Sequence, residues 1–105
     1  MTQQPERDAQ GFIVDLNTWT PTLAIEIASE EGIALTDDHW EVITLLRNFY
    51  MEFSISPAMR ILVKIVKEAL GEDKGNSIYL LTLFPQSPAK LASKISGLPK
   101  PTNCL

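Results

Sequence analysis

The residue with the clearest chemical potential is Cys104, the only cysteine of the 105-residue chain and the second residue from its end. A deprotonated thiol is a strong nucleophile toward sulfur, and the last residues of a domain are commonly exposed to solvent. Pro99 and Pro101 precede it and narrow the backbone conformations of this segment. The sequence therefore predicts a thiol that is presented on a stiff, mobile C-terminal arm over residues 98–105.

A thiolate in this position can attack the outer sulfur of a partner's persulfide and leave with that sulfur as its own persulfide. Such a carrier depends more on an arm long enough to bring the thiol to its partner than on a binding pocket. The eight positions after Gly97, the predicted hinge, span at most about 25 Å when extended. Lys100 favours the thiolate and the carboxylate of Leu105 disfavours it, so the balance in the free protein stays open.

The remaining residue types exclude most other enzyme chemistry. His39 is the only histidine, so it and Cys104 alone cannot supply the usual ligands of a zinc site. A cysteine-protease arrangement would need His39 to meet Cys104, and no local signature supports it. The five glycines are scattered as turns and helix stops, without a nucleotide-binding pattern. We expect no metal and no cofactor, and we assign the chemistry to the thiol.

Composition favours a single domain in the cytoplasm. Hydrophobic residues make up 45% of the chain, enough for one core without metals or disulfides. No segment approaches the roughly 18 apolar residues that span a bilayer, and the start lacks the features of a secretory leader. The net charge of −4 is unevenly distributed: residues 1–59 hold two basic and ten acidic side chains, whereas residues 60–105 hold seven and three. The half that carries the cysteine is the basic half.

Five segments carry helix signals, with a capping residue or a first-turn proline at the start and a glycine or proline after the end. The third is apolar on more than one side, so we expect it to be the central, most buried helix. His39 falls in the first turn of the second, where a structural role or exposure is expected. The helices are predicted from Pro21 to a stop at Gly32, from Thr36 to about Phe53, from Met59 to Leu70, from Ser77 to Phe84, and from Pro88 to about Ser96.

These segments predict a mainly α fold, a compact orthogonal bundle of about five helices that occupies residues 11–97. Residues 1–10 are polar and lack periodicity, so a loose N-terminal arm is expected there. Gly11–Asp15 is expected to form a short β-strand or part of a hairpin.

Short connections between the helices also permit a helix-turn-helix arrangement, which raises DNA binding as an alternative. The candidate recognition helix 57–70 is too apolar to lie in a groove. The other candidate, 77–84, has no Arg, Lys, Asn or Gln after its first turn to read base edges. Direct DNA binding is therefore not expected.

Several motifs, in the same order along nearly the whole chain, resemble the TusE/DsrC family. They include Gly75-Asn76-Ser77, Leu83-Phe84-Pro85 and Gly97-Leu98-Pro99-Lys100-Pro101 before a penultimate cysteine. The further matching segments are Thr36-Asp37-Asp38-His39-Trp40-Glu41-Val42, Leu46-Arg47-Asn48-Phe49-Tyr50, Ser56-Pro57-Ala58-Met59-Arg60 and Pro88-Ala89-Lys90.

The resemblance implies a small helical protein with a flexible C-terminal arm and Cys104 as the persulfide-carrying residue. It also implies a division of roles, since the DsrC proteins that act with dissimilatory sulfite reductase carry a second cysteine eleven positions earlier. Here that position is Ser93, which cannot form the disulfide. The TusE-like role is favoured: a sulfurtransferase that takes sulfur from a TusBCD-like donor and passes it to an MnmA-like thiouridylase for 2-thiouridine formation in tRNA.

The resemblance gives three cations supporting roles. Lys100 is expected to steer the arm or stabilise the thiolate, and Arg60 and Lys64 to meet an acidic partner, the tail carboxylate or tRNA phosphate. A solvated surface is the alternative for each. The free protein is expected to be a monomer. Two other functions stay open: a DsrC-like role in another sulfur pathway, and a non-catalytic binding or regulatory module.

Overall fold

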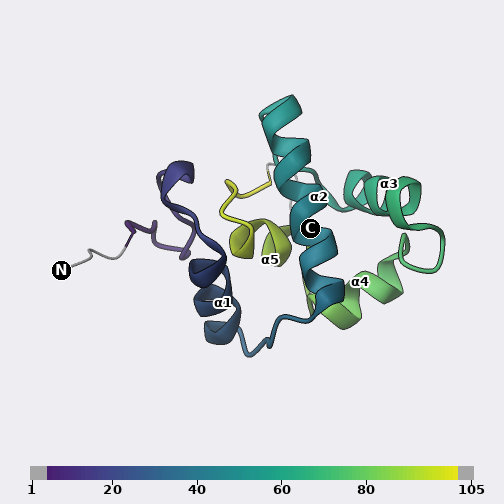
Figure 1. The fold of residues 1–105 in the computed structure, drawn as a ribbon, viewed down its shortest axis with the longest axis horizontal. Helices are drawn as coiled ribbons and strands as arrows, with labels where there is room; N and C mark the ends of the chain where they lie inside the picture. Colours follow the sequence, from purple (N-terminus) through teal and green to yellow (C-terminus); the bar gives the residue numbers. More distant parts are fainter. Residues whose placement is uncertain (1–4, 102–105) are drawn as a thin grey trace.

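Five α-helices build the part of the chain that the computed structural model describes, residues 5–101 (Figure 1). The mainly α fold with about five helices is thus confirmed. A short 3-10 helix, η1, precedes them. The elements are η1 (Leu16–Thr18), α1 (Pro21–Glu30), α2 (Asp37–Phe53), α3 (Met59–Leu70), α4 (Ser77–Leu83) and α5 (Pro88–Ile95).

Local capping explains where the helices begin. The Thr20 side chain accepts the N–H of Leu23 at 3.1 Å, and Pro21 occupies the first helical position of α1. The Asn76 side chain accepts the N–H of Tyr79 at 2.8 Å at the start of α4. Each cap satisfies a backbone donor that the helix itself leaves free, so the starts agree with the sequence.

The first turn of α2 uses His39 as a structural residue. Its side chain is only 6% exposed, and its ring meets Phe84 edge-on with centroids 5.2 Å apart. The Nδ1 atom accepts the backbone N–H of Thr36 at 3.0 Å. The Nε2–H group then donates to the Leu83 carbonyl at 2.8 Å, which ties the start of α2 to the end of α4. This arrangement requires the neutral imidazole with its proton on Nε2.

His39→Ala is expected to lower the free energy of unfolding by about 3 kcal/mol, because the buried Leu83 carbonyl and the Thr36 N–H lose their partner and a cavity remains. Thr44→Ala, at an exposed position of the same helix, is the control and should change stability by less than about 0.5 kcal/mol. Urea denaturation of both variants measures this. Equal stability of the two would contradict the role given to His39.

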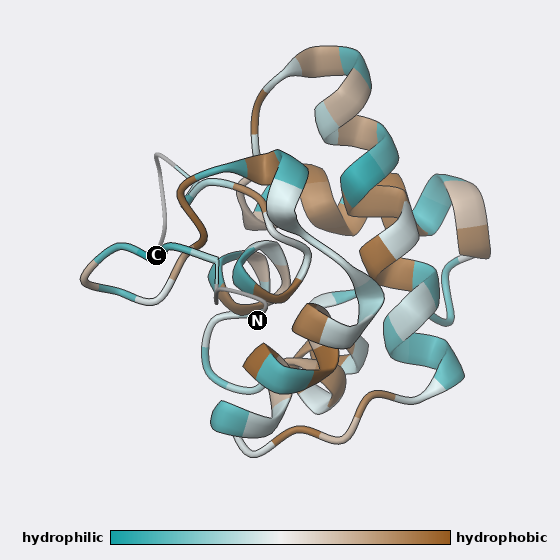
Figure 2. Ribbon diagram, turned by 60° about the vertical axis from the view of Figure 1, so that its left-hand side comes forward, coloured by the Kyte–Doolittle hydropathy of each residue, from teal (hydrophilic) through white to brown (hydrophobic). Residues whose placement is uncertain are grey.

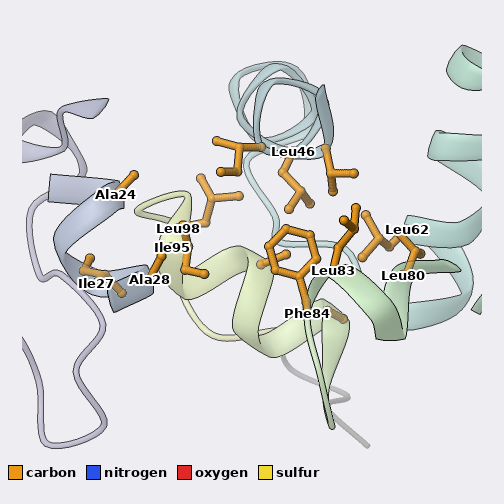
Figure 3. Packing of buried hydrophobic residues seen from close by; sticks show 14 of the residues in the cluster. Ala24, Ile27, Ala28, Leu46, Leu62, Leu80, Leu83, Phe84, Ile95 and Leu98 are labelled. Carbon is orange, nitrogen blue, oxygen red and sulfur yellow. The ribbon is translucent and has the colours of Figure 1, made fainter. Parts of the chain in front are cut away.

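Helix α5 lies at the centre of the bundle, between α1 on one side and α2 and α4 on the other (Figure 1). It packs against α1, α2, α3 and α4. Figure 3 shows Ile95 and Leu98 facing the α1 side chains while Leu83 and Phe84 fill the space beneath α2. Figure 2 shows apolar and polar residues alternating around the helical ribbons, as amphipathic packing requires.

The prediction that 59–70 would be the central, most buried helix was wrong. Only Leu62 and Val66 of α3 are fully buried, whereas α5 buries five of its eight residues. Small side chains such as Ala92 and Ser93 explain the difference, because they let four neighbouring helices approach one backbone.

The N-terminal segment is more ordered than the sequence suggested. Residues 1–4 lie outside the described part, but Arg7 and Ile13 form an antiparallel bridge and the Val14 N–H donates to the Glu6 carbonyl at 2.9 Å. Arg7 also binds Glu30 of α1 at 2.6 Å, and this hydrogen bond lowers the pKa of the Glu30 carboxyl. Within residues 5–101 the expected strand is thus reduced to one bridge, and the expected loose arm does not extend over residues 6–8.

Candidate functional site

The site is the point where the chain leaves α5. The helix ends in a Schellman motif: the Gly97 N–H donates to the Lys94 carbonyl at 3.2 Å and the Leu98 N–H to the Ser93 carbonyl at 2.9 Å. Gly97 adopts a φ of +75°, in the left-handed region that favours glycine. The glycine predicted to stop this helix does so.

Two side chains from distant parts of the sequence clamp the same helix end. The indole Nε1–H of Trp19 donates to the Ile95 carbonyl at 2.9 Å, and Arg47 Nη1 donates to the Ser96 carbonyl at 2.7 Å. The Arg47 guanidinium also lies 3.9 Å from the centre of the Trp19 ring, within cation–π range. Burial lowers the pKa of Arg47, although an arginine remains protonated at neutral pH. A positive charge therefore sits at the negative end of the α5 dipole.

Gly97 itself is in tight contact with this clamp. A Cβ atom built there would lie 2.3 Å from Cδ1 of Trp19, a separation at which something must shift. The role of Gly97 as a hinge stays a prediction, since motion at this residue has to occur against the indole ring.

The chain continues along the surface as what we call the arm root, residues 98–101. Leu98 is 2% exposed and belongs to the core, and Pro101 is also buried. The Ser56 hydroxyl donates to the Pro99 carbonyl, and Lys100 is exposed. Contacts therefore hold this half of the arm, where the sequence predicted a mobile segment over the full range 98–105.

Cys104 lies outside the described residues. It follows Pro101 by three positions in the sequence, a span of at most about 11 Å. With the root seated as it is here, the reach of the thiol is less than half of the length expected for an arm that is free after Gly97.

Arg60 and Lys64 lie on the exposed side of α3, one helical turn apart. Neither forms an ion pair or hydrogen bond with any residue in 5–101, and Lys100 also has no such partner there. Lys100 directly follows Pro99, whose carbonyl accepts a hydrogen bond from Ser56 in the segment before α3. It shows no contact between Lys100 and either α3 cation.

Other cations of the basic half neutralise the acidic half. Lys74 binds Asp38 at 3.2 Å and Glu41 at 2.7 Å, and Lys94 binds Glu31 at 2.8 Å. The seven basic side chains of residues 60–105 therefore do not form one basic face. The cations that remain without an acidic partner in the described part of the chain, apart from Arg47, are Arg60, Lys64, Lys90 and Lys100.

Ser93, the position that the family resemblance marks as a second cysteine in other members, is fully buried in α5. Its hydroxyl has no hydrogen-bond partner among the residues that the structure describes, and the same holds for Ser96. A buried hydroxyl without a partner carries a desolvation cost.

Ser93→Ala is therefore expected to leave stability unchanged or raise it by up to about 1 kcal/mol. Ser93→Val is the matched comparison and should destabilise by about 1–3 kcal/mol through overpacking. Thermal denaturation of the three proteins measures both effects. A loss of more than about 1 kcal/mol in the alanine variant would mean that the hydroxyl has a partner in solution.

Sequence reasoning missed Trp19 and Arg47 as residues of this site. Arg47 had one visible signal: it follows buried Ile43 by one helical turn, so it lies on the inner side of α2. Trp19 had none, because it stands in an irregular segment outside any periodic pattern. The site is a scaffold for the arm and not a pocket with its own reacting groups.

Residues 5–101 contain no group of three His, Asp or Glu side chains arranged to hold a metal ion. No helix within this range is long and apolar enough to cross a membrane.

Comparisons with known proteins agree with this architecture. A curated relative from Pectobacterium atrosepticum, named Sulfurtransferase TusE, is 56% identical over 93% of this chain and 90% of its own length. A TusE from Escherichia coli strain K12 is 51% identical over 95% of this chain and 92% of its length. The solution structure of DsrC from Allochromatium vinosum superposes with a TM-score of 0.89 at 46% identity, covering 98% of this chain and 92% of that one.

The oxidised DsrC of Archaeoglobus fulgidus, described as the gamma-subunit of dissimilatory sulfite reductase, gives a TM-score of 0.85 at 37% identity. It covers 98% of this chain and 94% of its own. The family model described as "DsrC like protein" matches residues 1–105. With a family model that matches residues 1–105 and curated relatives that are more than half identical over most of both chains, this chain belongs to the DsrC-like family.

Proposed function

We propose that the chain is a sulfur carrier that holds a persulfide on Cys104 and relays it between proteins. Its TusE relatives are sulfurtransferases by name at 51–56% identity, and we extend that activity to this chain. The observation that carries the proposal is the anchored arm root, which ends three residues before the only thiol of the chain. A reactive group on a short tether beside a rigid surface suits exchange with another protein.

The transfer step balances without an external oxidant. The Cys104 thiolate attacks the outer sulfur of a donor persulfide, a new sulfur–sulfur bond forms, and the donor leaves as a thiolate. The carrier then holds the sulfane sulfur with its proton as Cys–S–SH. Attack by an acceptor thiolate on that outer sulfur repeats the step and returns Cys104 to its thiolate form.

The route that we propose runs from a TusBCD-like donor complex to an MnmA-like thiouridylase, for 2-thiouridine formation at the wobble position of tRNA in the cytoplasm. The TusE name of the curated relatives supports this route. Lys100 is the described cation nearest in sequence to the thiol, and its positive charge favours the thiolate. Arg60 and Lys64 remain candidates for contact with an acidic partner or tRNA phosphate.

A DsrC-type role in another sulfur pathway is the second candidate, because the solved relatives are DsrC proteins. The observation against a redox pair is Ser93, which is buried in α5 and has no thiol to oxidise. The lone-carrier chemistry above needs only Cys104.

Intact-protein mass spectrometry tests the carrier. Incubation of the protein with glutathione persulfide should add one sulfur atom, and peptide mapping should place it on Cys104. Dithiothreitol should remove it, because a persulfide is reducible. If the added mass fails to form, or forms on a peptide that lacks Cys104, the carrier assignment is wrong.

A further inference from the structure

Exposed apolar side chains gather beside the arm root. Met51 is 79% exposed at the end of α2, and Ile55 is 59% exposed in the segment that leads to α3. Between them Ser54 takes a left-handed conformation with a φ of 58°, which is uncommon for serine and ends the helix there. Single exposed apolar residues are ordinary, but a cluster next to a functional segment marks an interaction surface.

Two shallow grooves connect this cluster to the arm root. One, of about 310 Å³, is lined by Met51 and by Leu98 of the root. The other, of about 210 Å³, is lined by Ile55 and Lys100. Tyr50 and Ser54 line both grooves. The end of α2 and the arm root thus form one continuous surface, which we call the arm-root surface: Tyr50, Met51, Ser54, Ile55, Leu98, Pro99 and Lys100.

The short segment between Pro101 and Cys104 limits how far from the arm-root surface a partner can bind. Because Cys104 lies at most about 11 Å from Pro101, a partner cysteine that exchanges sulfur with it must come within about 15 Å of the root. A stable protein interface buries about 800 Å² on each side, which corresponds to a disc of about 16 Å radius. A partner that brings its cysteine this close therefore places the protein surface around that cysteine on the arm root.

We propose that the arm-root surface is the docking site of the donor protein that gives Cys104 its sulfur, an inference that rests on the sulfur-carrier function. The chemistry of the surface defines its occupant. The partner presents apolar side chains to Met51 and Ile55 around its reactive cysteine, and a carboxylate to Lys100, which has no acidic partner among residues 5–101.

Single aspartate substitutions test the docking site, because they place a charge in the interface and leave the fold intact. Met51→Asp and Ile55→Asp are each expected to slow sulfur transfer from a purified, persulfide-loaded TusBCD complex at least about tenfold. The matched control is Ile78→Asp on α4, where the side chain is 76% exposed and lines neither groove. Loading by glutathione persulfide, which needs no docking, should proceed at the wild-type rate in all three.

The outcomes separate this inference from the sulfur-carrier function. Suppose that glutathione persulfide loads Cys104 in every protein. If Met51→Asp and Ile55→Asp then accept sulfur from TusBCD as fast as Ile78→Asp does, the docking site is refuted and the carrier function stands. If Cys104 loads from neither donor, the carrier function is wrong. Calorimetric binding in a Cys104→Ser background then tests the surface alone: affinity for TusBCD should fall at least about tenfold with Met51→Asp, and unchanged affinity refutes the docking site.

Discussion

Cys104→Ser is expected to abolish 2-thiouridine formation in a strain that depends on this protein, with thiolated tRNA falling to the level of the deletion strain. The reason is chemical. A serine hydroxyl is almost fully protonated near neutral pH and forms no bond that resembles a persulfide, so the sulfane sulfur has nowhere to reside. The loss should therefore be complete, not the partial loss that weakened binding produces.

Ser93→Ala and Ser96→Ala are the matched controls, because each removes a hydroxyl from a buried position at the base of the arm. Both should keep wild-type levels of thiolated tRNA, measured by mass spectrometry of digested nucleosides. Full thiolation in the Cys104→Ser strain would exclude the carrier role. Binding of partners that survives the serine substitution while thiolation persists would favour a non-catalytic module.

The sequence predicted the helix positions well because their signals are local. Thr20 and Asn76 are bound to backbone groups three residues away, so their side-chain types alone indicate a helix start. Gly32 and Gly97 both close helices with left-handed φ values of 77° and 75°. The mainly α fold followed from these signals and from the apolar spacing between them.

Local signals were less informative at Ser56, which resembles a helix cap before Pro57. Its hydroxyl instead donates to the Pro99 carbonyl, and α3 begins at Met59, as predicted, with Ala58 as its N-cap. The contacts that build the site span long distances in the chain: Trp19 to Ile95 and Arg47 to Ser96. Periodicity and capping signals describe only neighbours in the sequence, so these pairs could not be predicted from them.

The charge asymmetry of the sequence did not show where the cations lie in the fold, for a related reason. Lys74 and Lys94 of the basic half bind carboxylates of the acidic half, which are distant in sequence. The cations without acidic partners in residues 5–101 are therefore a small set, with Lys100 on the arm root. A carrier with few such charges depends more on apolar contact for its docking, which gives Met51 and Ile55 their weight in the proposed interface.

Gly97→Ala should destabilise the fold by about 3 kcal/mol, which corresponds to a fall in melting temperature of about 12–15 °C for a domain of this size. Two costs combine. An alanine at a φ of +75° costs about 1 kcal/mol, and its Cβ would lie 2.3 Å from Trp19 Cδ1. The indole is held by its bond to the Ile95 carbonyl and by Arg47 over its face, so it cannot turn away without breaking the clamp.

Gly32→Ala separates these costs. Gly32 closes α1 in the same Schellman motif at a φ of +77°, but nothing lies within 4 Å of a Cβ atom built there. It should lose only the conformational part, about 1 kcal/mol or about 5 °C. Calorimetric melting of both variants measures the difference. Equal losses of stability in the two variants would mean that the Trp19 ring moves aside without a free-energy cost, so that the arm root is less firmly held than its contacts indicate. A larger loss in Gly97→Ala would mean that the contacts of Trp19 and Arg47 with the end of α5 fix where the carrier presents its thiol.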